Sequence, residues 1–176
     1  MDALSLDDAR IVEKQIRRSL RGSNTVAVRC AYGYPQVLTV HPVLDGEPFP
    51  TLYWLTCPFL AKAIDRLESQ GTIPLLEARM RRQPKLRLSM QQAHRRYRAQ
   101  RSALLRSDAR AQLERSGMLA ALESRGIGGI ADAAGIKCLH LHVAHALADR
   151  NPIGSIVLKM LDACACSPDK VICSTL

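Results

Sequence analysis

The stretch Gly135–Gly154, GIKCLHLHVAHALADRNPIG, is the most distinctive segment of the 176-residue sequence. It holds three of the five histidines of the chain, and a cysteine stands just before them. Leucine and alanine dominate its centre, and Asn151-Pro152 is typical of the N-cap and first turn of a following helix. The stretch therefore predicts a helix that ends near Asp149 and that is buried, because it is apolar almost all round.

The polar residues of this helix predict a metal site. At 100° per residue, Cys138, His142 and His145 fall on one stripe. Asp149 continues the stripe, whereas His140 points to the opposite side. A thiolate together with imidazoles suits zinc, with iron as the second choice. The alternative is a packed helix whose histidines hydrogen-bond to carbonyl groups.

A strand is the second interpretation of the same residues. KCLHLHV alternates strictly, so Cys138, His140 and His142 would share one face of a strand. Both interpretations give a cysteine–histidine metal site, but with different ligands. The helix is favoured by the leucines and alanines and by the length of the segment.

Two further residues are candidates for catalysis or for a fourth metal ligand. Cys57, in TLYWLTCP, lies where a strand ends and a helix begins, and the N-terminus of a helix lowers the pKa of a thiol. Asp149 is the carboxylate nearest to the histidines in sequence and is the candidate general base. The alternative for Cys57 is a small buried apolar side chain.

The positive charge of the chain is concentrated in residues 79–115. This segment holds 12 Lys and Arg against two acidic residues, which gives +10, while the whole chain has a net charge of +9. Such a patch attracts phosphates, nucleic acid or an acidic partner. His94, Tyr97 and Arg101 share one helical face and form a candidate anion site. The alternatives are a solvated arginine-rich helix and side chains that satisfy backbone carbonyls.

The rest of the sequence predicts an α+β fold, in which a small antiparallel three-stranded meander packs against a mainly helical remainder. Runs rich in Val, Thr and Tyr predict the strands, and apolar residues at helical spacing predict the helices. The expected strands are 25–32, 36–42 and 51–55, and the expected helices are 6–20, 58–70, 75–82, 89–115 and 152–161. We expect one domain over residues 1–162 and a tail over residues 163–176.

Composition predicts a cytoplasmic protein. No apolar run approaches the roughly 18 residues of a membrane span, and MDALSLDDAR lacks the basic and apolar regions of a signal peptide. In a reducing compartment the six cysteines are expected to be thiols or metal ligands. Cys164, Cys166 and Cys173 in the tail match no familiar zinc spacing, and we expect incidental thiols there.

Several segments together resemble a bacterial family catalogued as domain of unknown function 501 (DUF501). They are FPTLYWLTCP, HRRYRAQR, GIGGI, GIKCLHLHVAHALA and NPIG, and the cysteine–histidine segment is the most specific of them. The resemblance implies a cytoplasmic bacterial protein and adds no mechanism. In some bacteria the family's genes lie near an exopolyphosphatase-like gene, which points to phosphate compounds. The tail CACSPDKVIC lies outside the resemblance.

The sequence thus favours a metalloprotein that binds or acts on an anionic ligand, which we expect to be phosphorylated. An enzyme of this kind would be a metal-assisted hydrolase, in which the ion activates water. The alternative is a module without enzymatic activity that binds nucleic acid or an acidic partner, with a structural metal or none. A scaffold without metal is the third interpretation.

Overall fold

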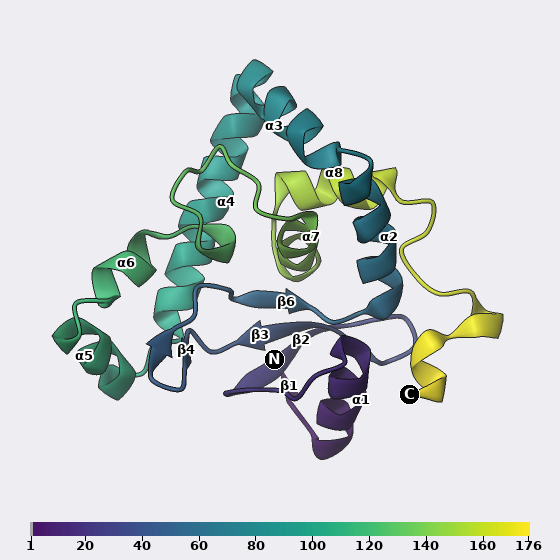
Figure 1. Ribbon diagram of the computed structural model, residues 1–176, viewed down its shortest axis with the longest axis horizontal. Helices are drawn as coiled ribbons and strands as arrows, with labels where there is room; N and C mark the ends of the chain where they lie inside the picture. The colour runs from purple at the N-terminus through teal and green to yellow at the C-terminus, as the bar shows by residue number, and fades with distance from the viewer. Residues whose placement is uncertain (1) are drawn as a thin grey trace.

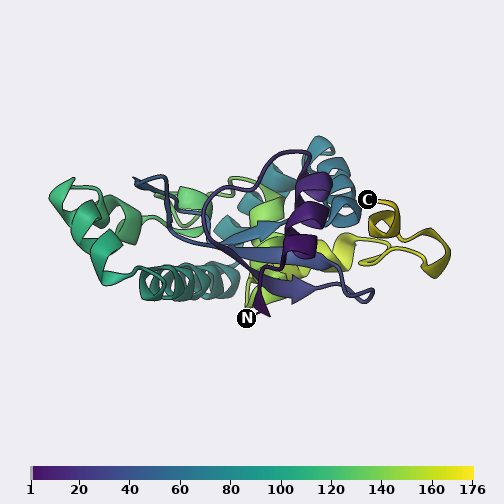
Figure 2. The ribbon, with the colours of Figure 1, turned by 90° about the horizontal axis from the view of Figure 1, so that it is seen from below.

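A small antiparallel sheet has one helix on one face and the main group of helices on the other (Figures 1 and 2). The computed structural model describes residues 2–176. The sheet has the order β1-β2-β3-β6, and its strands are β1 (Asp2–Ala3), β2 (Asn24–Arg29), β3 (Pro35–Val40) and β6 (Tyr53–Leu55). The predicted meander is confirmed as β2-β3-β6, and β1 adds an edge strand to it. A short hairpin of β4 (Val43–Leu44) and β5 (Glu47–Pro48) lies between β3 and β6 in the chain.

Helix α1 (Leu6–Ile16) covers one face of the sheet. Ser5 is the N-cap of this helix, because its Oγ accepts a hydrogen bond of 3.0 Å from the backbone N–H of Asp8. The helix ends earlier than predicted, since Arg17 adopts a left-handed conformation with φ of 54°. The apolar layer between α1 and the sheet consists of Val12, Val26 and Leu38.

Helix α7 (Leu139–Ala148) lies over the other face of the sheet and forms the centre of the larger core (Figure 1). The helices around it are α2 (Pro58–Ser69), α4 (Pro84–Ala103) and α8 (Pro152–Met160), and α3 (Thr72–Arg82) connects α2 to α4. The α7 side chains Leu139 and Val143 have no exposed surface. The prediction of a buried helix in the histidine segment is therefore confirmed, and so is the predicted α+β class.

The predicted helix 89–115 is wrong in its bounds. Two helices occupy this region: α4 begins already at Pro84, and α5 (Ser107–Arg115) follows after a break. Proline suits the first turn of a helix because it needs no N–H partner there, so Pro84 starts α4. The break comes at Arg106, which has an extended backbone.

The remaining segments are short. Helix α6 (Leu119–Ser124) and the 3-10 turn η1 (Ile127–Gly129) connect α5 to α7. After α8 the chain makes two 3-10 turns, η2 (Pro168–Lys170) and η3 (Ile172–Thr175), in the tail that lies on the side of α1 and α2 (Figures 1 and 2). Among the described helices, none combines the length and the hydropathy needed to cross a membrane.

Candidate functional site

Two of the three α7 histidines belong to a buried polar network and not to a metal site. His142 and His145 are 1% and 0% exposed. The Asn151 side-chain nitrogen lies 3.2 Å from His142 Nδ1 and 3.1 Å from His145 Nδ1, and its oxygen Oδ1 lies 3.3 Å from His142 Nδ1. Asn151 Oδ1 in turn accepts from the backbone N–H of Gly154 at 2.8 Å, which caps α8. The network thus joins the end of α7 to the start of α8.

Burial keeps both imidazoles neutral at pH 7. Loss of hydration lowers the pKa of His142 to about 3, although its contact with Asn151 acts in the opposite direction. Burial likewise lowers the pKa of His145 to about 4, although Asp149 lies 3.6 Å from its Nε2. His145 also stacks on Tyr53, with ring centroids 5.6 Å apart. Contacts with Asn151 and packing therefore hold both rings in the core, while His145 Nε2 has no hydrogen-bond partner among the described residues.

The predicted ligand set of Cys138, His142 and His145 is not brought together. The reason lies in the backbone: α7 begins at Leu139, and Cys138 is its N-cap with φ −159° and ψ 156°. The helical projection does not apply to an extended residue, so Cys138 leaves the stripe that it would share with the two buried histidines. It lies beside His140 instead, which the projection placed on the opposite side.

A cluster of Glu68, Cys138 and His140 forms at the N-terminal end of α7. One potential ligand atom from each lies within 4.8 Å of the other two, and within the described residues no other group of His, Cys, Asp or Glu does so. Glu68 comes from the last turn of α2 and accepts a hydrogen bond from the backbone N–H of Leu139. His140 Nδ1 lies 3.3 Å from Glu68 Oε1. All three side chains are half-buried, so solvent reaches the cluster.

The other ring nitrogen of His140 faces oxygen atoms of α2. His140 Nε2 lies 3.3 Å from the carbonyl oxygen of Ala61 and 3.3 Å from Asp65 Oδ1. The hydrogen bond with Cys138 and the charge of Glu68 outweigh burial and raise the pKa of His140 to about 9. The cluster thus favours positive charge at this position, whether it is carried by a proton or by a metal ion.

Sequence reasoning missed Glu68. This residue stands 71 positions before Leu139 and accepts a hydrogen bond from the backbone N–H of that residue. It ends a helix of ordinary amphipathic pattern, and nothing in its local sequence marks it as a ligand. Only the packing of α2 against α7 brings it to Cys138.

Cys57 is placed as predicted but does not have the predicted reactivity. It is the N-cap of α2 and is 8% exposed. Burial raises the pKa of its thiol, and this outweighs the hydrogen bonds from the backbone amides of Phe59 and Leu60. The expectation of a lowered pKa is wrong because the apolar surroundings destabilise the thiolate more than the helix N-terminus stabilises it.

The predicted anion site of His94, Tyr97 and Arg101 is a structural element of the core. The three side chains share the buried face of α4, as the sequence predicted. Their polar atoms, however, bind the backbone of neighbouring segments. Tyr97 Oη accepts from the N–H of Leu52 at 2.6 Å, and His94 Nδ1 accepts from the N–H of Ile127 at 3.1 Å.

Arg101 has no surface to offer an anion, because it is 1% exposed. Its guanidinium donates to four carbonyl oxygens, those of Pro50, Leu122, Arg125 and Gly126. The alternative that Arg101 satisfies backbone carbonyls therefore describes the structure, and the predicted clamp on a ligand does not.

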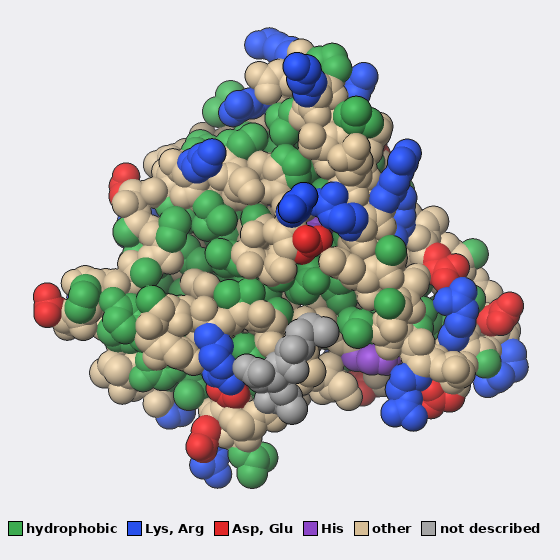
Figure 3. Space-filling view, turned by 180° about the vertical axis from the view of Figure 1, so that it is seen from behind, with side chains coloured by type: hydrophobic (Ala, Val, Ile, Leu, Met, Phe, Trp, Pro, Cys, Tyr) green, Lys and Arg blue, Asp and Glu red, His purple; other side chains and the backbone are tan. Residues whose placement is uncertain are grey.

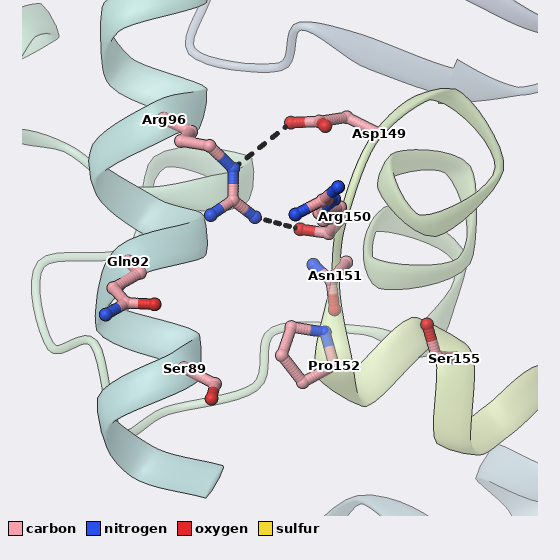
Figure 4. Close-up of a pocket in the computed structure, with 8 residues that line it drawn as sticks. All are labelled: Ser89, Gln92, Arg96, Asp149, Arg150, Asn151, Pro152 and Ser155. Carbon is pink, nitrogen blue, oxygen red and sulfur yellow. Dashed lines mark hydrogen bonds and ion pairs between the residues drawn. The ribbon is translucent and has the colours of Figure 1, made fainter. Parts of the chain in front are cut away.

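Asp149 lines a pocket of about 350 Å³ between α4 and the start of α8 (Figure 4). Arg96 reaches across from α4, with its Nε 3.5 Å from Asp149 Oδ2 and its Nη2 donating to the carbonyl of Arg150 at 2.7 Å. Burial raises the pKa of Asp149, but hydrogen bonds from the Arg150 backbone and from Gln100 outweigh it, so the pKa is lowered. A paired carboxylate with a lowered pKa is a weak general base, which argues against the catalytic role predicted for Asp149.

The positive segment is spread over several helices and partly neutralised. Lys and Arg side chains gather where α3 and α4 meet, at the top of Figure 3. Farther along the chain, Arg106 pairs with Asp108 at 3.4 Å and Arg110 pairs with Glu123 at 2.7 Å. With Arg101 buried and Arg96 beside Asp149, the free positive charge is smaller than the count of residues suggests.

The comparisons with known proteins give one result. The family profile described as protein of unknown function (DUF501) matches residues 26–159 of the 176 residues. Neither the curated proteins nor the solved structures give a match. The matched region runs from the first long strand to the last residues of α8 and includes all three residues of the Glu68–Cys138–His140 cluster. The chain therefore belongs to the DUF501 family.

Proposed function

We propose that this protein binds a transition-metal ion, zinc in the first place and iron in the second, through Glu68, Cys138 and His140. The observation that carries the proposal is the convergence of the three potential ligand atoms within 4.8 Å of one another. A thiolate, an imidazole and a carboxylate are all zinc ligands, with bond lengths of about 2.0 to 2.3 Å. Small side-chain movements bring the three atoms to these distances.

The surroundings of His140 support the proposal. Histidines that bind metals donate their second ring N–H to a carboxylate or a carbonyl, which fixes the tautomer and the orientation of the ring. With Nδ1 on the ion, His140 Nε2 would donate to the carbonyl of Ala61 or to Asp65, both 3.3 Å away. Cys138 and His140 would lose protons on binding, so the affinity for metal falls as the pH is lowered.

Three protein ligands leave the fourth position of a tetrahedral ion to water or to a substrate. This arrangement is typical of catalytic sites, whereas structural sites have four protein ligands. The three side chains are half-buried, so this position would be open to solvent. Metal-assisted hydrolysis is the reaction class that such an arrangement supports.

The test is metal binding by matched histidine variants. Protein purified without a metal-affinity column is dialysed against chelator and titrated with Zn²⁺ in a calorimeter. We expect His140→Ala to lower the affinity at this site by at least tenfold, because the ion loses one of three ligands. His145→Ala, five positions along the same helix, should bind as the wild type does. Equal affinity of wild type and His140→Ala, or loss of binding in His145→Ala alone, would contradict the proposal.

The second candidate function is the binding of a phosphorylated small molecule in the pocket between α4 and α8. Two arginines, Arg96 and Arg150, line this pocket, and Ser89, Gln92 and Ser155 add hydrogen-bonding groups (Figure 4). Its volume of about 350 Å³ lies in the range of ligand pockets. Guanidinium groups bind phosphate with two parallel hydrogen bonds, which favours an anionic ligand here.

The pocket and the metal cluster lie at opposite ends of α7. The helix has ten residues, which corresponds to about 15 Å at 1.5 Å per residue. A water on the ion therefore does not reach a small ligand in the pocket. The two candidate functions are thus independent. A single site that combines the metal ion with the basic surface is not supported by this arrangement.

Phosphate binding is tested with inorganic phosphate and pyrophosphate as probes. Arg96→Ala should weaken binding by tenfold or more, because Arg96 lines the pocket, whereas Arg81→Ala, on the exposed surface of α3, should leave it within twofold. Binding of generic RNA that exceeds phosphate binding and that falls steeply with salt would favour the nucleic-acid module instead.

A further inference from the structure

Four of the six cysteines line one small cavity at the side of the sheet. They are Cys30, Cys57, Cys166 and Cys173. Cys30 directly follows Arg29, the last residue of β2, and Cys57 is the N-cap of α2. Cys166 and Cys173 come from the tail. The cavity measures about 20 Å³, which is room for a single water molecule or ion. All four cysteines lie within the described residues and are free thiols.

We propose that Cys30, Cys57, Cys166 and Cys173 form a second metal centre, in which four thiolates bind one zinc ion and fasten the tail to the sheet. Four cysteine sulfurs around one ion are a standard ligand set of structural zinc sites. Three segments that are far apart in the sequence bring these four thiols to the same enclosed space. This proposal is independent of the Glu68–Cys138–His140 site.

The polar groups around the cavity fit thiolates. The side-chain nitrogen of Gln15 donates to Cys173 Sγ at 3.2 Å and to the carbonyl of Pro35 at 2.9 Å. The backbone amides of Phe59 and Leu60 face the sulfur of Cys57. Such N–H···S contacts orient thiolate ligands and support their negative charge in metal sites.

One buried atom at the cavity lacks a partner. Gln15 is 8% exposed, and its Oε1 has no hydrogen-bond partner among the described residues. A buried amide oxygen without a partner costs free energy, so it points to a water or another group that fills the space beside it. The cavity that Gln15 lines provides that space.

Metal binding requires the sulfurs around the cavity to move closer together. Zinc–sulfur bonds of about 2.3 Å place the sulfurs of a tetrahedral site about 3.8 Å apart. Within the described residues, no three of the four cavity sulfurs lie within 4.8 Å of one another. Two of the four sulfurs belong to the tail, which contains only the short turns η2 and η3, so its rearrangement contributes to this movement. On binding, the four thiols release their protons to solvent and the ion accepts four sulfur electron pairs.

The test measures zinc, iron and sulfide in full-length protein purified in reducing buffer without a metal-affinity column. The His140→Ala background removes the other proposed site, so that the two proposals fail separately. There we expect one zinc per chain, which is lost in Cys173→Ser and in Cys166→Ser. Cys164→Ser is the matched control and should retain the zinc, because Cys164 is exposed and does not line the cavity.

A second measurement uses the wild-type protein, so it does not depend on whether a variant folds without the metal. The wild-type protein is alkylated with iodoacetamide before and after chelation, and the modified cysteines are identified by mass spectrometry. We expect the four cavity cysteines to be protected until zinc is removed, and hydrogen exchange in residues 162–176 to accelerate on removal. Equal alkylation in both states, disulfides between these cysteines, or iron with sulfide and visible absorption in place of zinc would overturn the proposal.

Discussion

At the scale of single residues, the same residue type has opposite roles in this protein. His142 and His145 are packed and neutral, and the side chain of Asn151 contacts both rings. His140, on the same helix, is half-buried among a thiol and two carboxylates, and its pKa rises to about 9. The environment and not the spacing along the chain decides which histidine can hold an ion.

Arg101 provides a prediction at this scale. Because its guanidinium holds four carbonyl oxygens in the core, Arg101→Lys leaves several of them without a donor. We expect a loss of about 2 to 3 kcal/mol in the free energy of unfolding, since hydrogen bonds to charged groups are worth about 1.5 to 3 kcal/mol each. Arg96→Lys, at the half-exposed pocket, should cost less than about 0.5 kcal/mol. Urea unfolding of both variants measures this difference, and equal losses would show that Arg101 has no special structural role.

At the scale of secondary structure, patterns that depend on local chemistry predicted the three-stranded meander and the starts of several helices. Asn151 acts as the N-cap of α8 and Pro152 stands in its first turn, as expected. Ser5 likewise caps α1, and Pro58 stands in the first turn of α2. The predicted helix 89–115 was wrong because the break at Arg106 carries no glycine or proline. A helical pattern continues across that break in the sequence, and only the contacts of α5 with α6 and of α4 with the core show that the chain turns.

The ends of elements also explain why the predicted ligand set of Cys138, His142 and His145 does not converge. A helical projection assumes that every residue of the segment is helical. Cys138 lies one position before α7 and is extended, so its side chain has a direction that the projection cannot give. The contribution of Glu68 depends on tertiary packing and could not be read from its own helix. The candidate cluster therefore lies in the segment that the sequence indicated, but its members differ from the predicted ligand set.

The contact of α7 with α8 gives a prediction at the scale of elements. A Cβ atom at Gly154 would lie 2.0 Å from the carbonyl oxygen of His142, which is backbone and cannot move aside. Gly154→Ala should therefore destabilise the fold by about 3 kcal/mol, the upper part of the range for overpacked sites. Ser155→Ala, the adjacent exposed position, should change stability by less than about 0.5 kcal/mol. Thermal unfolding of the two variants measures this difference. An equal melting temperature of Gly154→Ala and the wild type would contradict the prediction.

At the scale of the whole molecule, one buried helix connects three chemically distinct regions. Helix α7 carries the Glu68–Cys138–His140 cluster at its start, the imidazole network in its middle and the pocket at its end. The four-cysteine cavity lies at the side of the sheet, where the tail returns to β2 and α2. The fold therefore separates the candidate sites, although Cys138, His140 and Asp149 stand close together in the sequence.

The buried imidazoles make the stability of the whole molecule dependent on pH. Burial lowers the pKa of His94 and of His145 to about 4, whereas an unfolded histidine titrates near 6.5. The unfolded state thus binds more protons between pH 6.5 and pH 4, so stability falls as the pH falls through this range. Each pKa unit corresponds to about 1.4 kcal/mol, so each histidine removes up to about 3 kcal/mol by pH 4.

Urea unfolding at pH 7, 5.5 and 4.5 checks this dependence. The ion pair of Asp8 with Arg29 does not confound it, because the pKa of Asp8 is lowered to about 2 and its contribution is lost mainly below pH 4. His145→Gln should lower the stability at pH 7 but reduce the slope with pH. A free energy of unfolding that stays constant from pH 7 to pH 4.5 would mean that the histidines are not buried as described.

An anomalous difference map at the zinc absorption edge shows directly whether the cluster at the start of α7 binds a metal ion. Crystals of the full-length protein grown with Zn²⁺ should show a peak about 2.0 to 2.3 Å from Cys138 Sγ, His140 Nδ1 and a carboxylate oxygen of Glu68. A peak at the four-cysteine cavity would be resolved separately and would not affect this result. A map with no peak at Cys138, or with a peak between His142 and His145 in its place, would contradict the account.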